Sequence, residues 1–215
     1  MPQRPLMNHL TDANPALGSL NGKLYLVWKG ADDPFLSWSV HSWSLLLGDR
    51  WTSPQAVPGI DDFTDKGPAL GSVRRIDGEW LFIAWKSTRH DNAISWAMFS
   101  GNDWFYIGPL LDRATSDSPA LGSVNDRLHM VWKGADADTT IWWSPYDVEE
   151  DNWSPQRPLT DRSTDTRPAL GLVDGSLLMA WKSGSQIQTS YLDGDEWSSP
   201  FTISDLRCFS GPALG

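Results

Sequence analysis

The sequence contains a single cysteine, six lysines and no long apolar run. One thiol, Cys208, excludes an intramolecular disulfide framework. No stretch has the length and apolarity of a membrane span, and no signal peptide begins at Met1. We therefore expect a soluble chain without an export signal, and the sequence does not indicate its compartment.

Basic residues are scarce, because 17 Lys and Arg stand against 27 Asp and Glu, which gives a formal net charge of −10. Nucleic acids and anionic membrane surfaces are held largely by Lys and Arg, so the charge argues against both as partners. The four histidines occupy unrelated places in the repeat described below: His9, His41, His90 and His129. We therefore expect no metal centre, no Ser-His-Asp arrangement and no cofactor.

No segment shows a sustained helical period. The chain instead repeats the tetrapeptide Pro-Ala-Leu-Gly, whose copies start at Pro15, Pro68, Pro119, Pro168 and Pro212. The intervals of 53, 51, 49 and 44 residues suit four short strands each and are too long for a leucine-rich or helical solenoid unit. The chain is thus a repeat array.

Within each unit, apolar runs of four to seven residues are separated by Asn, Asp and Gly, which is typical of strands joined by tight turns. After the first run, Asn21-Gly22, Asp77-Gly78 and Asp174-Gly175 favour type I′ hairpin turns, and Asn125-Asp126 takes the same place. The second run, for example Leu24–Trp28, is apolar on both faces. Such strands belong inside a stack of sheets.

We predict an all-β propeller with four complete four-stranded blades and partial blade strands at both termini. One domain covers residues 1–215, with blades at about 15–67, 68–118, 119–167 and 168–211 and terminal strands at 1–14 and 212–215. A β-sandwich of short strands is the alternative, and it does not explain a fivefold tetrapeptide. Open terminal strands would expose sheet edges, so a homo-oligomer that covers them is possible.

Fourteen tryptophans are present, and eight recur at two repeat positions where we expect them to form the core between blades. Four end the second strand, and four begin the fourth: Trp28, Trp85, Trp132 and Trp181, then Trp51, Trp104, Trp153 and Trp197.

A lysine follows the second-strand Trp in every unit: Lys29, Lys86, Lys133 and Lys182. A threonine lies four residues before each of the first four Pro-Ala-Leu-Gly prolines, and Asp12, Asp65 and Asp165 follow it in three units. Antiparallel order places both registers on one face of the disc. These residues either form ion pairs and turns that hold adjacent blades together or line a ring of ligand pockets.

The third strands place Trp38, Trp96 and Trp143 in register, with Thr189 in the fourth unit. An indole beside polar groups suits stacking on a sugar face, although core packing explains Trp as well. The predicted ligand-binding residues are therefore these three tryptophans together with the four lysines and three aspartates.

Several features together resemble the repeat of bacterial and fungal lectin propellers, including the fucose-binding kind, over the whole chain. They are Pro-Ala followed by small residues, a strand ending in an aromatic or charged pair, a Trp-bearing third strand and a turn into Trp-Ser-x-Pro. The repeat is also similar to sialidase-type propellers, because Ser190–Trp197 matches the Ser, Gly and Trp of their Asp box, with Leu192 in place of its Asp. The resemblance implies a sugar-binding propeller.

An enzyme of the sialidase type needs an arginine cluster and a nucleophile with a carboxylate partner. The eleven arginines share no register, and Arg113 and Arg162 are the only pair matched in position. We therefore predict a non-enzymatic, multivalent carbohydrate-binding propeller with weak repeated sites for glycans. The alternatives are an interaction or assembly propeller without sugar sites and a glycosidase relative.

Overall fold

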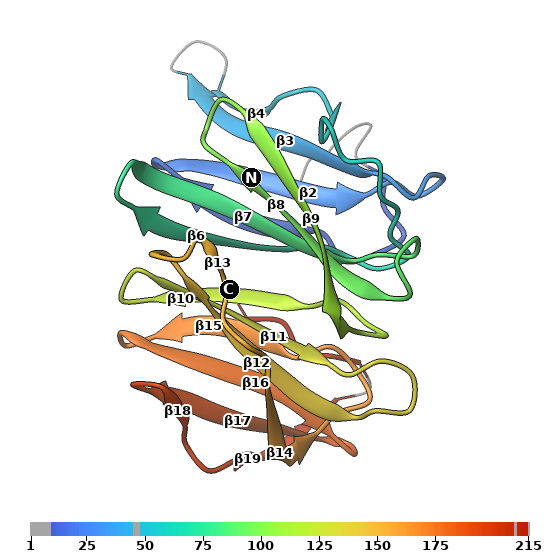
Figure 1. Ribbon diagram of the computed structural model, residues 1–215, viewed down its shortest axis with the longest axis vertical. Helices are drawn as coiled ribbons and strands as arrows, with labels where there is room; N and C mark the ends of the chain where they lie inside the picture. Colours follow the sequence, from blue (N-terminus) through green and yellow to red (C-terminus); the bar gives the residue numbers. More distant parts are fainter. Residues whose placement is uncertain (1–9, 45–47, 209, 215) are drawn as a thin grey trace.

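The computed structural model describes residues 10–44, 48–208 and 210–214, and these residues form four antiparallel sheets and no helix. The sheets follow one another in chain order as the blades of a β-propeller, with the first and last blades at opposite ends of the molecule (Figure 1). The predicted all-β propeller of four blades is confirmed, whereas residues 212–214, on which the C-terminal strand was predicted, form no strand. No described helix is long and apolar enough to cross a membrane.

In every blade, successive strands pair as neighbours, and in three of them the fourth strand is divided into two pieces that both pair with the third strand. The first blade contains β1 (Ala16–Leu20), β2 (Lys23–Lys29), β3 (Leu36–Ser44), β4 (Gly48–Trp51) and β5 (Gln55–Ala56). The second contains β6 (Ala69–Arg75), β7 (Gly78–Lys86), β8 (Ala93–Phe99) and β9 (Trp104–Ala114).

The third blade contains β10 (Ala120–Val124), β11 (Arg127–Lys133), β12 (Thr140–Asp147), β13 (Asn152–Trp153) and β14 (Arg157–Ser163). The fourth contains β15 (Ala169–Val173), β16 (Ser176–Ser183), β17 (Gln186–Asp193), β18 (Glu196–Trp197) and β19 (Phe201–Arg207). Residues 1–9, on which the predicted N-terminal strand falls, lie outside the described residues.

The first hairpin turn has the predicted type in three blades, where both central residues have positive φ, as at Asn21 (49°) and Gly22 (72°). The second blade differs from the prediction. There Arg75 pairs with Gly78, so the turn consists of Ile76 and Asp77 rather than Asp77-Gly78. The two strands have a longer ladder in this blade, and the turn moves outward with it.

The glycine of Pro-Ala-Leu-Gly allows the innermost strands to approach closely. A Cβ at Gly18 would lie 2.9 Å from Leu81 Cδ1 and 3.0 Å from Leu70 Cβ of the next blade. Gly71 and Gly122 are equally close to the blades that follow them. The same contact occurs a fourth time, because a Cβ at Gly171 would lie 2.8 Å from Leu214 Cβ of the fifth tetrapeptide. The inner strands are thus too close together at these four positions for a larger residue to replace glycine without a shift.

The hydrophobic core consists of three clusters, one between each pair of consecutive blades. The four tryptophans that end the second strands are all buried, as predicted. Burial of apolar side chains between sheets is worth about 25 cal/mol per Å². Each blade is therefore stabilised by the apolar side chains that it buries against the neighbouring blades.

Candidate functional site

The loops after the second and fourth strands meet on one face, as the sequence predicts. The register threonines donate their backbone N–H to the loop between β2 and β3, β7 and β8, or β11 and β12: Thr64 to Pro34 O, Thr115 to Asn92 O and Thr164 to Thr139 O. Cys208 donates in the same way to Ser185 O. This loop face holds both predicted polar registers.

Three of the four register lysines form ion pairs with the register aspartates. The Nζ–Oδ1 distance is 2.7 Å for Lys29–Asp12 and 2.8 Å for Lys86–Asp65. Lys182 Nζ lies 2.7 Å from both carboxylate oxygens of Asp165. Each pair joins the end of a second strand to the loop that enters the same blade, so it fixes the loop face.

The third blade departs from this pattern because Ser116 stands where the other units have Asp. Lys133 Nζ donates to Ser116 Oγ at 2.7 Å and to three backbone oxygens, those of Gly134, Asp136 and Asp138, at 3.0 to 3.2 Å. The carboxylate of Asp117 instead accepts from the backbone N–H of Arg167 at 2.9 Å. The third lysine is therefore enclosed by protein acceptors.

The accessible part of each ion pair is the carboxylate. The side chains of Asp12, Asp65 and Asp165 are at least half exposed, whereas their lysines are mostly covered. The hydrogen bond from its lysine is the main cause that lowers the pKa of Asp12, and the same holds for Asp165. The carboxylates of Asp12 and Asp165 therefore stay charged at neutral pH. All three carboxylates are held by their lysines and remain partly open to solvent.

The register threonines are structural. Thr64 Oγ1 donates to Lys66 O at 3.0 Å and accepts from Lys66 N at 3.1 Å. The same two-residue turn forms at Thr11, Thr115 and Thr164. Cys208 occupies this position in the fifth unit, and its thiol donates to Ser210 O. Its place four residues before Pro212 was the sequence signal for that equivalence.

The third-strand tryptophans lie between the blades. Trp96 and Trp143 are 2% exposed, and Trp38 is half-buried among Tyr25, Phe99 and Trp104. Stacking needs a ring face open to solvent, and here packing with other residues covers the faces of Trp96 and Trp143. Ligand binding by these three rings stays a prediction.

Another repeat position lies two residues before the register threonine. From the sequence it was not recognised as a position shared by all the blade boundaries. Arg113 donates to Ser144 Oγ at 3.0 Å and to Ser154 O at 2.9 Å in the next blade. Arg162 donates to Ser198 O at 2.7 Å in the fourth blade. Both side chains are buried and bind protein groups, so neither projects toward a substrate carboxylate.

The first boundary has an acid at this position. Asp62 is 1% exposed and accepts from Ser95 Oγ at 2.5 Å, Ser87 Oγ at 2.7 Å and Trp85 Nε1 at 3.2 Å. A buried carboxyl group must be hydrogen-bonded, and here three side chains of the second blade supply the donors. Only the match of Arg113 with Arg162 was visible in the sequence.

His129 is also buried, and it accepts a hydrogen bond from Trp143 Nε1 at its Nδ1, at 3.1 Å. Burial lowers its pKa from 6.5 to about 4, with a smaller contribution from Arg127. Because the folded pKa is below the unfolded one, the unfolded chain takes up the proton first as pH falls. We expect the free energy of unfolding to fall by about 3 kcal/mol between pH 6.5 and pH 4.

Urea denaturation at a series of pH values measures this loss. The matched variant is His129→Leu, because Leu178 holds the equivalent place in the fourth blade. The free energy of unfolding of His129→Leu should not show the fall that protonation of His129 causes in the parent. Equal pH profiles for the two proteins would contradict the assignment.

An exposed ring lies on the loop face at the first blade boundary. Phe35, between β2 and β3, is 42% exposed and meets Phe63 edge to face at 4.9 Å between ring centroids. The guanidinium of Arg89 lies 3.9 Å from the centre of the Phe63 ring. Phe63 is two residues before Asp65, so an apolar ring and a fixed carboxylate share this part of the surface.

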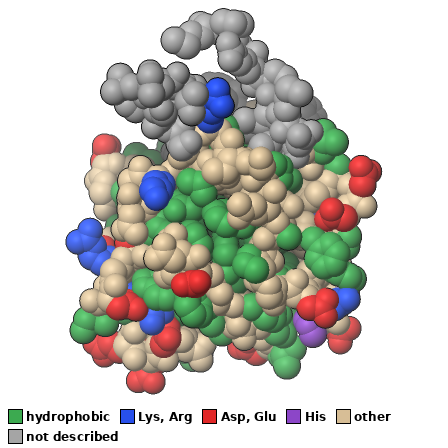
Figure 2. All heavy atoms as spheres, turned by 90° about the horizontal axis from the view of Figure 1, so that it is seen from above, with side chains coloured by type: hydrophobic (Ala, Val, Ile, Leu, Met, Phe, Trp, Pro, Cys, Tyr) green, Lys and Arg blue, Asp and Glu red, His purple; other side chains and the backbone are tan. Residues whose placement is uncertain are grey.

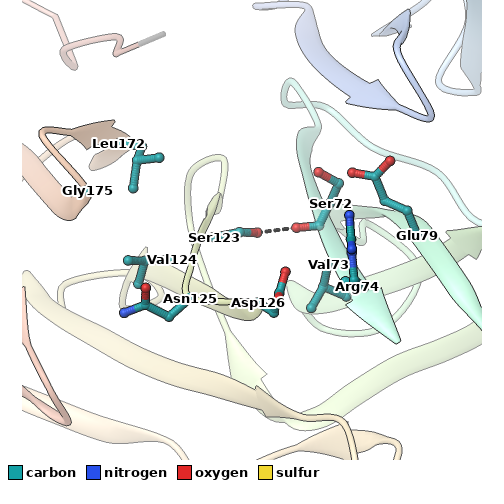
Figure 3. Close-up of a pocket in the computed structure, with 10 residues that line it drawn as sticks. All are labelled: Ser72, Val73, Arg74, Glu79, Ser123, Val124, Asn125, Asp126, Leu172 and Gly175. Atoms are coloured by element: carbon teal, nitrogen blue, oxygen red, sulfur yellow. Dashed lines mark hydrogen bonds between the residues drawn. The ribbon is translucent and has the colours of Figure 1, made fainter. Parts of the chain in front are cut away.

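Two hollows lie along the inner strands. One, of about 330 Å³, is lined by the Pro-Ala-Leu residues of all five tetrapeptides. The other, of about 290 Å³, lies where the turns after the innermost strands of blades 2 to 4 meet (Figure 3). Ser123 Oγ donates to Ser72 O across this second hollow, and Arg74, Glu79 and Asp126 line it. Neither hollow repeats once per blade.

The described residues contain no group of three or more His, Cys, Asp or Glu side chains that could hold a metal ion. The segment that resembles an Asp box is the hairpin between β17 and β18. Its Ser190 Oγ donates to Ser198 O at 2.7 Å, and Ser39 and Ser144 make the same bond in their blades. This motif stabilises the outer edge of a blade.

No protein-family model and no curated protein matches the sequence. Among solved structures, AofleA from Arthrobotrys oligospora is similar at 12% identity and a TM-score of 0.63, over 90% of this chain and 57% of that one. The lectin of Aleuria aurantia, in complex with Fucalpha1-6GlcNAc, is similar at 14% identity and a TM-score of 0.59, over 90% and 63%.

An arabinoxylan arabinofuranohydrolase of glycoside hydrolase family 43 from Bacillus subtilis is similar at 11% identity and a TM-score of 0.60. The alignment covers 93% of this chain and 53% of the enzyme. The chain thus spans less than two-thirds of the length of each of these proteins. At such identities the likeness shows the propeller fold that lectins and glycosidases share.

Proposed function

We propose that the chain is a non-enzymatic carbohydrate-binding propeller whose contacts lie on the loop face. The observation that carries this proposal is the repeated carboxylate, at least half exposed and fixed by a mostly covered lysine, at Asp12, Asp65 and Asp165. A fixed carboxylate accepts two hydrogen bonds from neighbouring sugar hydroxyls without further ordering cost. The similar lectin of Aleuria aurantia, solved in complex with Fucalpha1-6GlcNAc, supports the same class of ligand.

The site at Asp65 has the strongest argument. Phe35 supplies an exposed apolar ring near the carboxylate, and pockets for sugars combine an apolar surface with a few oriented polar groups. No equivalent ring pair exists at the other two sites, where Leu10 precedes Asp12 and Ser163 precedes Asp165 at the position of Phe63. We therefore expect this site to bind more tightly than those at Asp12 and Asp165.

A glycan array followed by titration calorimetry with the best ligand tests the proposal. We expect Phe35→Ala and Asp65→Asn each to weaken binding by about 1 to 3 kcal/mol, the usual cost of losing a hydrogen bond to a charged group or a stacked ring. Asp103→Asn, in the turn between β8 and β9, is the matched control and should bind like the parent.

A blank array across neutral and acidic glycans would overturn the proposal. An assembly propeller without sugar sites would then be the better description, and the exposed apolar side chains of Leu17 and Tyr191 favour that second candidate. Turnover of a chromogenic glycoside, abolished by one carboxylate substitution, would instead support a glycosidase relative.

A further inference from the structure

The outer rim between the second and third blades departs from the repeat. Phe105 follows the register Trp of the fourth strand in the second blade, whereas the other blades have polar residues there: Thr52, Ser154 and Ser198. The backbone pairing with the third strand shows that these four residues hold one place. Phe105 is 44% exposed, and Ile107 on the same strand is 50% exposed. A polar position of the repeat is therefore apolar at this boundary.

The strand that carries these side chains is an undivided sheet edge. β9 runs over 11 residues and pairs with β8 alone among the described strands, whereas the fourth strand of every other blade is divided. An edge strand presents backbone N–H and C=O groups to any chain that can pair with it, and proteins usually shorten or charge such an edge. Gln156 Nε2 of the third blade donates to Asp112 O at 2.6 Å, and Pro109 has no N–H to donate. The open part of the edge is thus the segment before Pro109.

Aromatic and charged side chains extend this surface to the third blade. The rings of Trp80 and Phe105 lie 5.5 Å apart between centroids. The guanidinium of Arg75 lies 5.2 Å from the centre of the Trp80 ring, and it donates to Asp151 at 2.5 Å and to Tyr146 OH at 3.1 Å. The other blades have polar residues in the place of Trp80: Lys23, Arg127 and Ser176. We call Trp80, Phe105 and Ile107 the rim patch.

The third blade places an acidic turn beside the rim patch. Val148–Asp151 form a four-residue turn between β12 and β13, whereas the turn between β17 and β18 has two residues. Val148 and Trp80 pack against the same core cluster. The turn carries Asp151 and the exposed Glu149 and Glu150, and it has no Lys or Arg. Figure 2, seen from the end at the first blade, shows Lys and Arg as well as Asp and Glu on that surface, so the wholly acidic turn is a local feature.

We propose that the rim patch binds an extended segment of a partner protein in which Lys or Arg stands beside apolar residues. The segment adds a strand to the open part of β9 and packs its apolar side chains on Phe105 and Trp80. Its cations lie on the aromatic faces and against the acidic turn. A second copy of this chain, with a net charge of −10, lacks the complementary charge.

This proposal does not rest on sugar binding. The turn between β12 and β13 lies at the opposite ends of the strands from the loop face that holds Asp12, Asp65 and Asp165. Phe105→Ser should therefore leave glycan binding unchanged, and Asp65→Asn should leave peptide binding unchanged. The two proposals can fail separately.

A phage library of random ten-residue peptides, panned against the whole immobilised chain, tests the proposal. We expect the enriched peptides to carry Lys or Arg beside aliphatic or aromatic residues. An enriched peptide, labelled and titrated by fluorescence anisotropy, should bind Phe105→Ser about tenfold or more weakly than the parent, as for an aromatic anchor at an interface. Ser holds this place in the third and fourth blades, so the variant should unfold in urea like the parent.

Glu149→Lys tests the charge of the acidic turn. It should weaken peptide binding several-fold at low salt, and the difference should shrink in 1 M salt because exposed charges are screened. Glu196→Lys is the matched control, because Glu196 is an exposed acid in the corresponding hairpin of the fourth blade, and it should bind the peptide like the parent. Ile107→Ser is a second patch variant in case Phe105→Ser fails to fold.

Three results would overturn the proposal. The first is a library in which no basic and apolar sequence is enriched. The second is an enriched peptide that binds the two patch variants as tightly as the parent, since its site then lies elsewhere. The third is equal weakening by Glu149→Lys and Glu196→Lys, which would show a response to net charge alone.

Discussion

Replacing Trp96 by Ala is expected to lower the free energy of unfolding by about 3–5 kcal/mol, the cost of removing an aromatic ring from a core. Trp96 stacks on Phe82 with 5.6 Å between centroids and meets Trp153 at 5.9 Å and Tyr146 at 5.7 Å across the blade boundary. The substitution removes packing from both the second and the third blade. Urea denaturation followed by tryptophan fluorescence measures the loss.

Thr189→Ala is the control, because Thr189 holds the same register position in the fourth blade. Its side chain is small, so about 1 kcal/mol is the expected cost, in the ordinary range for single substitutions. The outcome that would contradict the packing role is a Trp96→Ala protein of unchanged stability that has lost sugar binding. That result would restore the indole as a ligand platform.

The fold could be predicted from the sequence because the same contact between inner strands recurs in every repeat. Gly18, Gly71, Gly122 and Gly171 all mark one close approach, and a spacing near 50 residues leaves room for four strands. The turn of the second blade was placed one residue too late because Asp77-Gly78 has the composition of a I′ turn. The position of this turn depends on how many residues of β6 and β7 pair, and residue composition does not indicate that number.

The polar registers were equally visible, but their meaning depended on geometry. The sequence showed that Lys86 and Asp65 recur, and only the structure shows the lysine covered and the carboxylate exposed. For Trp96 and Trp143, core packing and a sugar platform predict the same residue type. The sequence did not reveal Asp62 as the equivalent of Arg113, because the two side chains have opposite charges.

Lys133→Met is expected to destabilise the chain by about 3 kcal/mol. The ammonium group of Lys133, on a residue that is 5% exposed, donates to Ser116 Oγ and to the backbone oxygens of residues 134, 136 and 138. A methionine of similar length leaves these acceptors unpaired, and each buried unsatisfied group costs about 1–3 kcal/mol unless water reaches it. Thermal and urea unfolding measure the effect.

Lys182→Met is the matched control, since Lys182 holds the same register place and pairs with the exposed carboxylate of Asp165. Exposed pairs contribute about 0–1 kcal/mol, and salt screens them. The difference between the two variants should therefore persist in 1 M salt. If Lys133 instead contacts ligand, its variant will unfold like the parent and lose affinity per folded molecule, which would contradict the enclosed ammonium site.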